Sequence, residues 1–267
     1  EARDYNIIGC VEPQKSGKTE GWHDAAFFNM CRPLELVFSN GIDKGVRIGP
    51  ATGNVEDMTT FEQFYDAYKK QMDYAIQLLV NADNAIDMAH AERCPLPFLS
   101  SMVDDCMKVG KTVQEGGAVY NFTGPQGFGV ANMADSLYSV KTLVYDEKKI
   151  TMGELKEALA TNYGKGLGAE DVAAMTAKIA NELKEAGKTI GEKEVAAILN
   201  TVVAASEAPE VKANGERILK LIEEVPKFGN DIPEVDAFAR DVAYTYTEPL
   251  QNYKNPRGGS FQAGLYP

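Results

Sequence analysis

The chain has few of the residues from which thiol and metal sites are usually built. Its 267 residues include four cysteines and two histidines, and no Cys-x-x-Cys pair occurs. A structural zinc site needs four closely spaced ligands, so this composition argues against one. A disulfide framework is equally unsupported in a long chain with so few cysteines. We therefore expect reduced thiols, and the reducing interior of a cell, the cytoplasm, as the location.

Long apolar runs and positive charge are also scarce. No run of eighteen apolar residues exists, and the opening residues, 1–4, do not resemble a signal peptide. The 27 basic and 39 acidic side chains give a net charge of -12. Nucleic acids and anionic membrane surfaces repel an acidic protein, so we expect neither as a partner.

The two ends of the sequence suggest a piece of a longer protein. The chain opens inside an apparent strand at residues 5–9 and closes on a glycine-rich loop at 255–267. Between them, residues 13–21 are turn formers. We predict a helix that begins near His23 or Asp24 and carries Phe27, Phe28, Met30 and Leu34 inward.

Helical periodicity dominates the remainder. A long helix is predicted over 60–91, opened by a capping box of Thr59 and Glu62. Further helices are expected over 131–143, after a second capping box of Thr151 and Glu154, and from Asp231 onward. Residues 161–224, rich in Ala, Lys and Glu, are interpreted as a peripheral helical subdomain. The sequence is therefore helix-dominated with few strands.

Two glycine-containing segments resemble phosphate-binding loops, and neither fits. Ser16-Gly17-Lys18-Thr19 lacks the glycine that a P-loop needs five residues before its Gly-Lys pair, because Glu12 stands there and a carboxylate repels phosphate. The Gly124–Gly129 segment has the wrong spacing for a dinucleotide loop. We interpret it as a tight turn that leads into the next helix.

Cys10 and Glu12 form the most informative constellation. They lie two residues apart at a strand-to-loop transition, and in an extended backbone both side chains point to the same side. A neighbouring carboxylate raises the pKa of a thiol, since like charges disfavour ionisation. That arrangement is poor for a thiolate nucleophile and harmless to a neutral thiyl radical. A thiol hydrolase therefore remains a weaker alternative.

These residues resemble the cysteine loop of the glycyl radical enzymes, which reads Gly9-Cys10-Val11-Glu12-Pro13 here. The run at 14–29, QKSGKTEGWHDAAFFN, is similar to the glycerol and propanediol dehydratase branch of that family. The resemblance continues through four further blocks, at 89–93, 95–104, 120–132 and 255–259. It covers most of the chain outside 161–224, and that added segment favours a propanediol dehydratase.

The resemblance implies an α/β fold. This piece would be part of a ten-stranded β/α barrel, mostly α-helical with few strands. Residues 1–160 would be the cysteine-loop part of the catalytic barrel, 161–224 a peripheral helical insertion, and 225–267 a return to the barrel.

The resemblance also implies a B12-independent, anaerobic dehydratase. Cys10 would carry the thiyl radical, Glu12 would be the general base, and Asp24 would hold the hydroxyls of a small diol. Proton transfer to such a base typically contributes about 10² to 10⁴ in rate. His23 and His90 are expected to be structural, and Cys31, Cys94 and Cys106 to be inert core thiols.

No bound cofactor or metal is expected in this chain. The family's radical is a protein-based glycyl radical installed by a radical SAM activating enzyme, and its Arg-Val-x-Gly-Tyr motif is absent from this sequence. The implied partners are a diol, the activating enzyme, the remainder of the polypeptide and a second copy in a homodimer. A bacterial microcompartment is a further implied location. We expect residues 1–267 alone to be inactive.

Two other functions stay open. Choline and isethionate lyases, which cleave C–N and C–S bonds, share the Cys-Val-Glu sequence, although a carboxylate at Asp24 should repel a sulfonate. From another class, the chain could be a non-catalytic structural protein.

Overall fold

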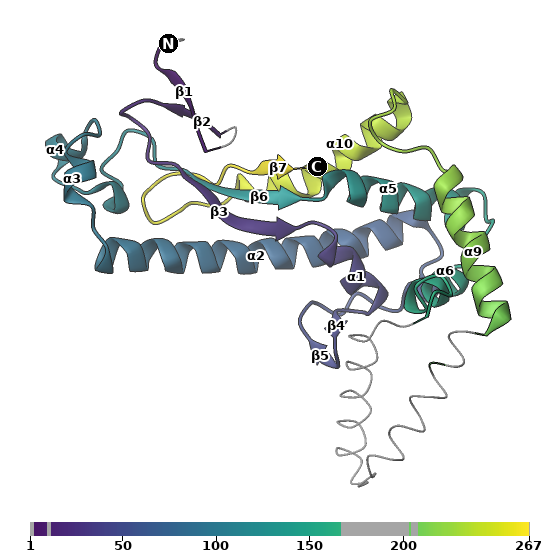
Figure 1. The fold of residues 1–267 in the computed structure, drawn as a ribbon. Coiled ribbons are helices and arrows are strands. Elements are labelled where there is room, and N and C mark those ends of the chain that lie inside the picture. Colours follow the sequence, from purple (N-terminus) through teal and green to yellow (C-terminus); the bar gives the residue numbers. More distant parts are fainter. Residues whose placement is uncertain (1–2, 10–11, 167–202, 204–207, 267) are drawn as a thin grey trace, which may run out of the picture. The chain divides into compact units, whose positions relative to one another are not determined.

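The structure is a computed structural model that describes residues 3–9, 12–166, 203 and 208–266 (Figure 1). The chain divides into two compact units. Unit 1 contains Glu1–Pro33, Met72–Ala134 and Ala237–Pro267, and unit 2 contains Leu34–Gln71 and Asp135–Asp236. Each unit thus combines segments that are distant in sequence. The predicted division at 160 and 224 stays a prediction.

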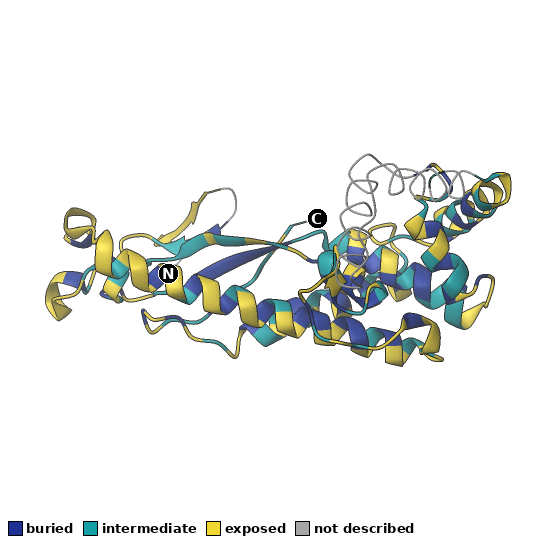
Figure 2. Ribbon diagram, turned by 90° about the horizontal axis from the view of Figure 1, so that it is seen from below, coloured by how far each residue is buried: buried dark blue, intermediate teal, exposed yellow. Residues whose placement is uncertain are grey.

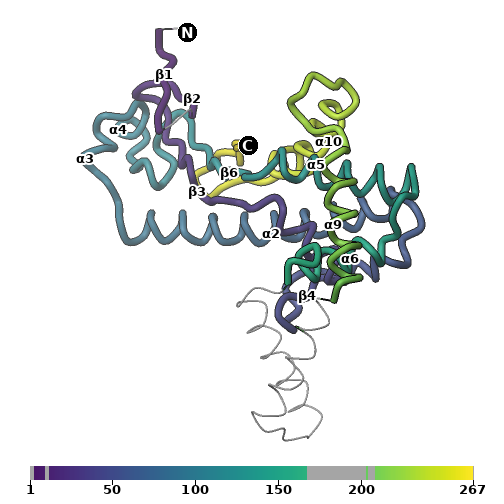
Figure 3. The backbone as a smooth tube through the Cα atoms, turned by 45° about the vertical axis from the view of Figure 1, so that its right-hand side comes forward, coloured from purple at the N-terminus to yellow at the C-terminus, as the bar shows by residue number. Residues whose placement is uncertain are grey.

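A parallel sheet forms the centre of unit 1. Its strands are β3 (Trp22–Asn29), β6 (Thr123–Phe128) and β7 (Gly264–Tyr266), and β6 lies in the middle. Figure 3 shows β3 and β6 running side by side. Parallel strands need long crossover connections, so this sheet joins segments from the start, middle and end of the chain. The predicted loop at 255–267 accordingly ends in a strand.

The predicted helix from His23 to Leu34 is wrong, because that segment is strand β3 followed by helix α1 (Arg32–Phe38). Phe27 is 69% exposed and contacts the ring of Phe128, whereas Phe28 stacks on Tyr246 at 5.0 Å between ring centroids. Neighbouring aromatics with different packing partners fit the alternation of a strand. A short apolar run does not distinguish helix from strand, which is why the periodicity misled.

The predicted turn at Gly124–Gly129 is also wrong, because this segment is the central strand β6. Gly127 has a packing role there, since a Cβ atom at this position would lie 2.7 Å from the ring of Tyr246. Pro125 lacks a backbone N–H, and the pairing with β3 shifts register between His23 and Phe27, beside that proline. Tertiary packing therefore explains why Pro125 and Gly127, which locally favour a turn, lie in a strand.

An antiparallel hairpin precedes the sheet. Strand β1 (Tyr5–Ile8) confirms the strand predicted at the start of the chain, and it pairs with β2 (Glu12–Lys15) so that Ile8 lies opposite Glu12. The predicted turn over 13–21 is therefore wrong for its first three residues. All four residues of β1 are exposed.

The predicted long helix is confirmed as α2 (Phe61–Arg93). Its capping box lies one residue later than predicted: the Gln63 amide N–H donates to Thr60 Oγ1 at 3.4 Å, and Gln63 Oε1 accepts from the N–H groups of Thr59 and Thr60. Figure 2 shows buried and exposed positions alternating along the helix. Its fully buried large side chains are Phe64, Tyr68, Met72 and Ile76.

A buried ion pair joins several parts of unit 1. Arg257 donates from Nε to Asp87 Oδ2 at 2.9 Å, and both side chains are nearly inaccessible. The same guanidinium donates to the carbonyl oxygens of Glu20 and Phe122, each at 2.9 Å. One cation therefore connects α2, the segment before β3 and the segment before β6.

The other short elements of this unit are α3 (Pro97–Ser100), α4 (Cys106–Val109) and the 3-10 turn η2 (Val113–Glu115).

Unit 2 is mostly helical. It contains α1, a two-stranded hairpin of β4 (Ile42–Asp43) and β5 (Val46–Arg47), and a 3-10 turn η1 (Val55–Asp57). The predicted helix over 131–143 is observed as α5 (Val130–Val140), which crosses from unit 1 into unit 2, followed by a π-helical turn η3 (Lys141–Asp146). Helix α6 (Met152–Ala160) confirms the capping box of Thr151 and Glu154, with both reciprocal bonds present.

Most of the predicted peripheral subdomain, 161–224, lies outside the described residues. Its described helix is α9 (Pro209–Glu224), where Arg217 forms an ion pair with Glu154 of α6 at 2.8 Å. The helix predicted from Asp231 is confirmed as α10 (Pro233–Leu250). Its spacing predicts an inner face of Val235, Phe238, Ala239, Val242 and Tyr246, and all of these are buried except Phe238, which is half-buried. In the part of the chain that the structure describes, no helix has the length and apolarity to cross a membrane.

Candidate active site

Cys10 and Val11 lie outside the described residues, so the predicted geometry of the Cys10–Glu12 pair stays a prediction. The flanking residues are described. Ile8 ends β1, Glu12 begins β2, and these two residues pair across the hairpin. The hairpin register therefore positions the carboxylate directly after the cysteine segment.

The side chain of Glu12 is buried, with 5% of its surface exposed. Gly9 provides the space that this carboxylate occupies: its φ is +60°, and a Cβ atom at Gly9 would lie 2.5 Å from Glu12 Oε2. The backbone conformation disfavours any residue with a side chain, and a Cβ atom here would require the Glu12 carboxylate to move. A glycine before the cysteine therefore allows the Glu12 carboxylate to lie close to the backbone at Gly9.

Tyr266 is a site residue that the sequence analysis missed. Its hydroxyl donates to Glu12 Oε1 at 3.3 Å. The ring stacks on Phe128 of β6, with 4.8 Å between centroids and 10° between planes. No local signal marks this residue, because its position depends on β7 pairing with β6 across more than a hundred residues. A hydrogen bond to the ionised carboxylate favours the charged form that a base requires.

His23 lies within the electrostatic influence of two carboxylates. Its ring packs edge to face on Phe122, with 4.6 Å between centroids. Nε2 is buried and makes no hydrogen bond to any described residue. Burial lowers the pKa of His23, although the negative charges of Glu12 and Asp24 act to raise it. The imidazole is therefore neutral near pH 7.

Asp24 occupies an irregular point of strand β3. Its φ is +52°, in the left-handed region that non-glycine residues seldom adopt. The side chain is exposed, and the register of β3 against β6 shifts between His23 and Phe27. Bulges of this kind redirect side chains and are common beside active sites. The structure thus places Asp24 and Glu12 around His23, two of the three residues that the sequence singled out.

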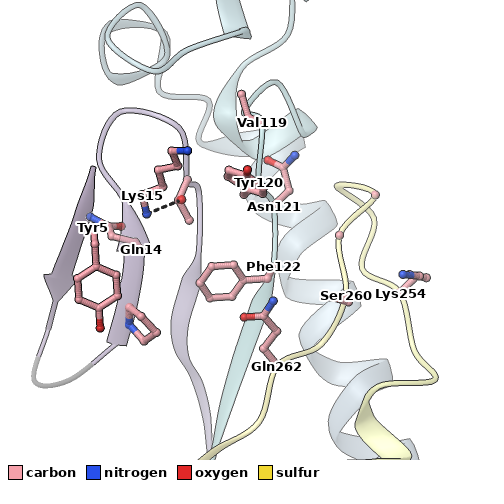
Figure 4. Close-up of a pocket in the computed structure, with 14 residues that line it drawn as sticks. Tyr5, Gln14, Lys15, Val119, Tyr120, Asn121, Phe122, Lys254, Ser260 and Gln262 are labelled. Carbon is pink, nitrogen blue, oxygen red and sulfur yellow. Dashed lines mark hydrogen bonds between the residues drawn. The ribbon is translucent and has the colours of Figure 1, made fainter. Parts of the chain in front are cut away.

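A cavity of about 610 Å³ adjoins the hairpin (Figure 4). Figure 4 shows side chains from the hairpin on one side, with Phe122 and Gln262 opposite. The labelled lining residues are mostly hydroxyl, amide and amine side chains: Tyr5, Gln14, Lys15, Tyr120, Asn121, Lys254, Ser260 and Gln262. Pro13, the residue after Glu12, also lines it. Val119 and Phe122 also line it, so polar and apolar groups both face this cavity.

The three cysteines other than Cys10 do not all lie in the core, contrary to the prediction. Cys106 is buried, Cys31 is half-buried and Cys94 is exposed, so the prediction of three core thiols is wrong for Cys94. His90 is exposed and its ring packs edge to face against Trp22, with 5.8 Å between centroids, so its structural role stays a prediction. Within the described ranges, no cluster of three or more His, Cys, Asp or Glu side chains could hold a metal ion.

Comparison with known proteins identifies the family. Residues 1–267 match the family described as PFL-like, pyruvate formate lyase-like. The chain belongs to this family. The predicted resemblance to the glycyl radical enzymes is thereby confirmed, and so is the α/β fold class as part of that barrel.

Two solved structures of the family cover the whole chain. One, of 1,2-propanediol dehydration in Roseburia inulinivorans, is 60% identical with a TM-score of 0.95. The other, a glycerol-bound B12-independent glycerol dehydratase from Clostridium butyricum, is 48% identical with a TM-score of 0.79. A (2S)-3-sulfopropanediol dehydratase from Klebsiella oxytoca is 31% identical over 268 residues, which include all of this chain.

The chain spans about a third or less of these relatives. It covers 32% and 28% of the two solved chains, and 27% of the sulfopropanediol dehydratase.

Proposed function

We propose that the protein containing this chain is a radical dehydratase that removes water from a small vicinal diol. The reaction would convert 1,2-propanediol to propionaldehyde or glycerol to 3-hydroxypropionaldehyde. The observation that carries the proposal is the buried Glu12 carboxylate, two residues after Cys10 and hydrogen-bonded by Tyr266. The 60% identity to the structure of 1,2-propanediol dehydration supports propanediol as the first substrate to test.

In the proposed mechanism, Cys10 and Glu12 act on one substrate carbon. The family's glycyl radical, which lies outside this chain, would take the hydrogen atom of the Cys10 thiol, so that the glycine regains its C–H bond and Cys10 becomes a thiyl radical. Cys10 takes the hydrogen atom from a hydroxyl-bearing carbon, and Glu12 takes the proton of that hydroxyl. The resulting ketyl expels the neighbouring hydroxyl, which leaves as water with the proton that Glu12 accepted. The product radical then recovers its hydrogen atom from Cys10, so diol yields aldehyde and water.

The groups beside Glu12, the Tyr266 hydroxyl and the His23 imidazole, are compatible with Glu12 acting as a base. A base must be ionised before it accepts a proton, and the hydroxyl of Tyr266 stabilises the ionised form. A cationic histidine beside Glu12 would compete for the same carboxylate. Because burial lowers the pKa of His23, the imidazole does not supply that cation. We propose that Asp24 binds the substrate hydroxyls and that His23 is a neutral positioning residue.

The proposed partners and location follow from the family. We propose that a radical SAM activating enzyme installs the glycyl radical, and that the remainder of the polypeptide completes the site. A homodimer, and a cytoplasmic or microcompartment location, are part of the same proposal. They require direct tests by co-purification and fractionation.

An assay of the full-length, activated protein tests the reaction class. The substrates are 1,2-propanediol, glycerol, choline and isethionate, each measured for kcat/KM. We expect the highest value for 1,2-propanediol or glycerol. Preference for choline or isethionate would refute the dehydratase proposal in favour of C–N or C–S cleavage. A Cys10→Ser variant that keeps full function would instead indicate a structural protein.

A further inference from the structure

Unit 2 contains a cavity that the proposed reaction does not use. Its volume is about 170 Å³. The apolar side chains around it come from α1, α5, η3, α6, α9 and the loop between η3 and α6: Leu34, Phe38, Val140, Leu143, Ile150, Leu155, Leu159 and Ile222. An apolar cavity of about 150 Å³ stays dry and accepts a molecule such as benzene. This cavity therefore has room for a ligand of roughly six non-hydrogen atoms.

The backbone around this cavity is irregular at two points. Leu143 belongs to the π-helical turn Lys141–Asp146, and such turns occur frequently at functional sites. Tyr163 also lines the cavity, and both Asn162 and Tyr163 have positive φ, at 49° and 56°. Two consecutive non-glycine residues in that region store strain, which clusters at ligand sites. The cavity and these two irregularities are independent observations at one place.

The polar side chains around the cavity differ in the hydrogen bonds that they make. The Lys227 amine donates to the carbonyl oxygens of Ile222 and Val225, so it is engaged at the end of α9. Asp135 Oδ1 accepts from the Phe228 N–H at 2.8 Å. The Tyr163 side chain also lines the cavity, and burial raises the pKa of its hydroxyl. It remains a protonated donor at the edge of an apolar space.

We propose that unit 2 holds a binding site for a short aliphatic molecule with one hydroxyl or carbonyl group. Its carbon chain lies among Leu143, Ile150 and Leu155, and its oxygen accepts a hydrogen bond from Tyr163. An ion is disfavoured there, because Lys227 and Asp135 are already bonded to backbone groups and burying a further charge without a partner is costly. All the residues that line this site belong to unit 2, and none of them is a residue proposed for the diol chemistry.

Fluorine NMR of the full-length protein with 3,3,3-trifluoropropan-1-ol tests this site. Val140 lines the cavity, and Val140→Phe places a larger side chain there. Val109→Phe is the matched control, because Val109 is 50% exposed on α4 of unit 1. We expect line broadening with the native protein and with Val109→Phe, and at least a tenfold loss of affinity with Val140→Phe. Tyr163→Phe should weaken binding about two- to tenfold, the effect of one hydrogen bond.

Crystals under xenon pressure provide a second measurement that does not depend on Val140→Phe folding. Xenon should bind between Leu143 and Leu155 in the native protein. Equal probe affinity in all variants, or an empty cavity under xenon, would overturn the proposal. A side chain from elsewhere in the full-length protein filling the space would do the same.

Discussion

Among the described residues, the buried Asp, Glu, Lys and Arg side chains are Glu12, Asp83, Asp87 and Arg257, and all four belong to unit 1. The buried polar side chains of unit 2 are Gln71 and Ser139, which carry no charge. Burial of charge is unfavourable unless it is paired or serves a function. The contrast indicates that buried charged side chains contribute to the core of unit 1. Unit 2 is stabilised mainly by apolar packing.

The largest effect on stability should come from the buried ion pair of unit 1. Arg257→Met leaves the Asp87 carboxylate buried without its partner and should destabilise unit 1 by about 3–5 kcal/mol. The matched control is Arg240→Met, because the Arg240–Asp241 pair is exposed and should contribute less than about 1 kcal/mol. Hydrogen exchange of the β6 amides measures the difference. Equal effects of the two substitutions would show that burial gives the Arg257–Asp87 pair no special weight in the stability of unit 1.

The double variant Asp87→Leu with Arg257→Met sharpens the same point. Removing both charges eliminates the unpaired carboxylate, so much of the lost protection of β6 should return. If protection stays as low as in Arg257→Met, the hydrogen bonds of Arg257 to Glu20 and Phe122 matter more than the ion pair.

Asp83 should make the stability of unit 1 depend on pH. Burial, with a smaller contribution from the charge of Asp87, raises the pKa of Asp83 from 3.8 to about 6. The folded state therefore binds more protons than the unfolded state between about pH 4 and 6, and stability falls as pH rises through that window. Asp83→Asn should remove this slope and stabilise the protein by roughly 2–3 kcal/mol at pH 7. Urea denaturation at pH 4.5 and pH 7 measures it, and an unchanged slope would contradict the account.

Gly127 tests the packing of the parallel sheet. Gly127→Ala introduces a Cβ atom 2.7 Å from the ring of Tyr246, and such overpacking should destabilise the protein by about 1–3 kcal/mol. Gly17→Ala is a control with nothing within 4 Å, although its φ of +68° adds a smaller backbone strain. The denaturation midpoint should fall further for Gly127→Ala. The reverse order would argue against the close packing of β6 on α10.

The smallest effect belongs to unit 2. Thr151→Ala removes the N-cap of α6 and should destabilise unit 2 by about 1 kcal/mol, without altering protection of the β6 amides. Thr151→Ser keeps the capping oxygen and should be close to neutral. Hydrogen exchange of α6 compared with β6 distinguishes the units. Loss of protection in both would show that they unfold together.

These results also separate what the sequence could predict from what it could not. Helix α2, the Thr151 cap and the buried face of α10 are encoded locally, by periodicity and by residues three or four apart. Strands β3, β6 and β7 depend on pairing between segments about a hundred residues or more apart. Their local signals, such as Pro125 and Gly127, favour a turn.

The candidate site divides in the same way. The spacing of Cys10 and Glu12, together with the family resemblance, was enough to select Glu12, which the structure places in a buried position. Tyr266 could not be selected, because only the pairing of β7 with β6 brings it to that carboxylate. The neutral state of His23 was equally hidden, since it results from burial by Phe122 and neighbouring residues.

The most direct test of the account is the Glu12→Gln variant of the full-length, activated protein, measured with 1,2-propanediol. Glutamine keeps the shape of the side chain but cannot accept the proton, so kcat should fall about 10²- to 10⁴-fold. The glycyl radical signal in electron paramagnetic resonance should remain at the native level, as it should in the control Glu62→Gln, whose kcat should not change. A Glu12→Gln protein with normal radical content and native kcat would contradict the central claim that this buried carboxylate is the base.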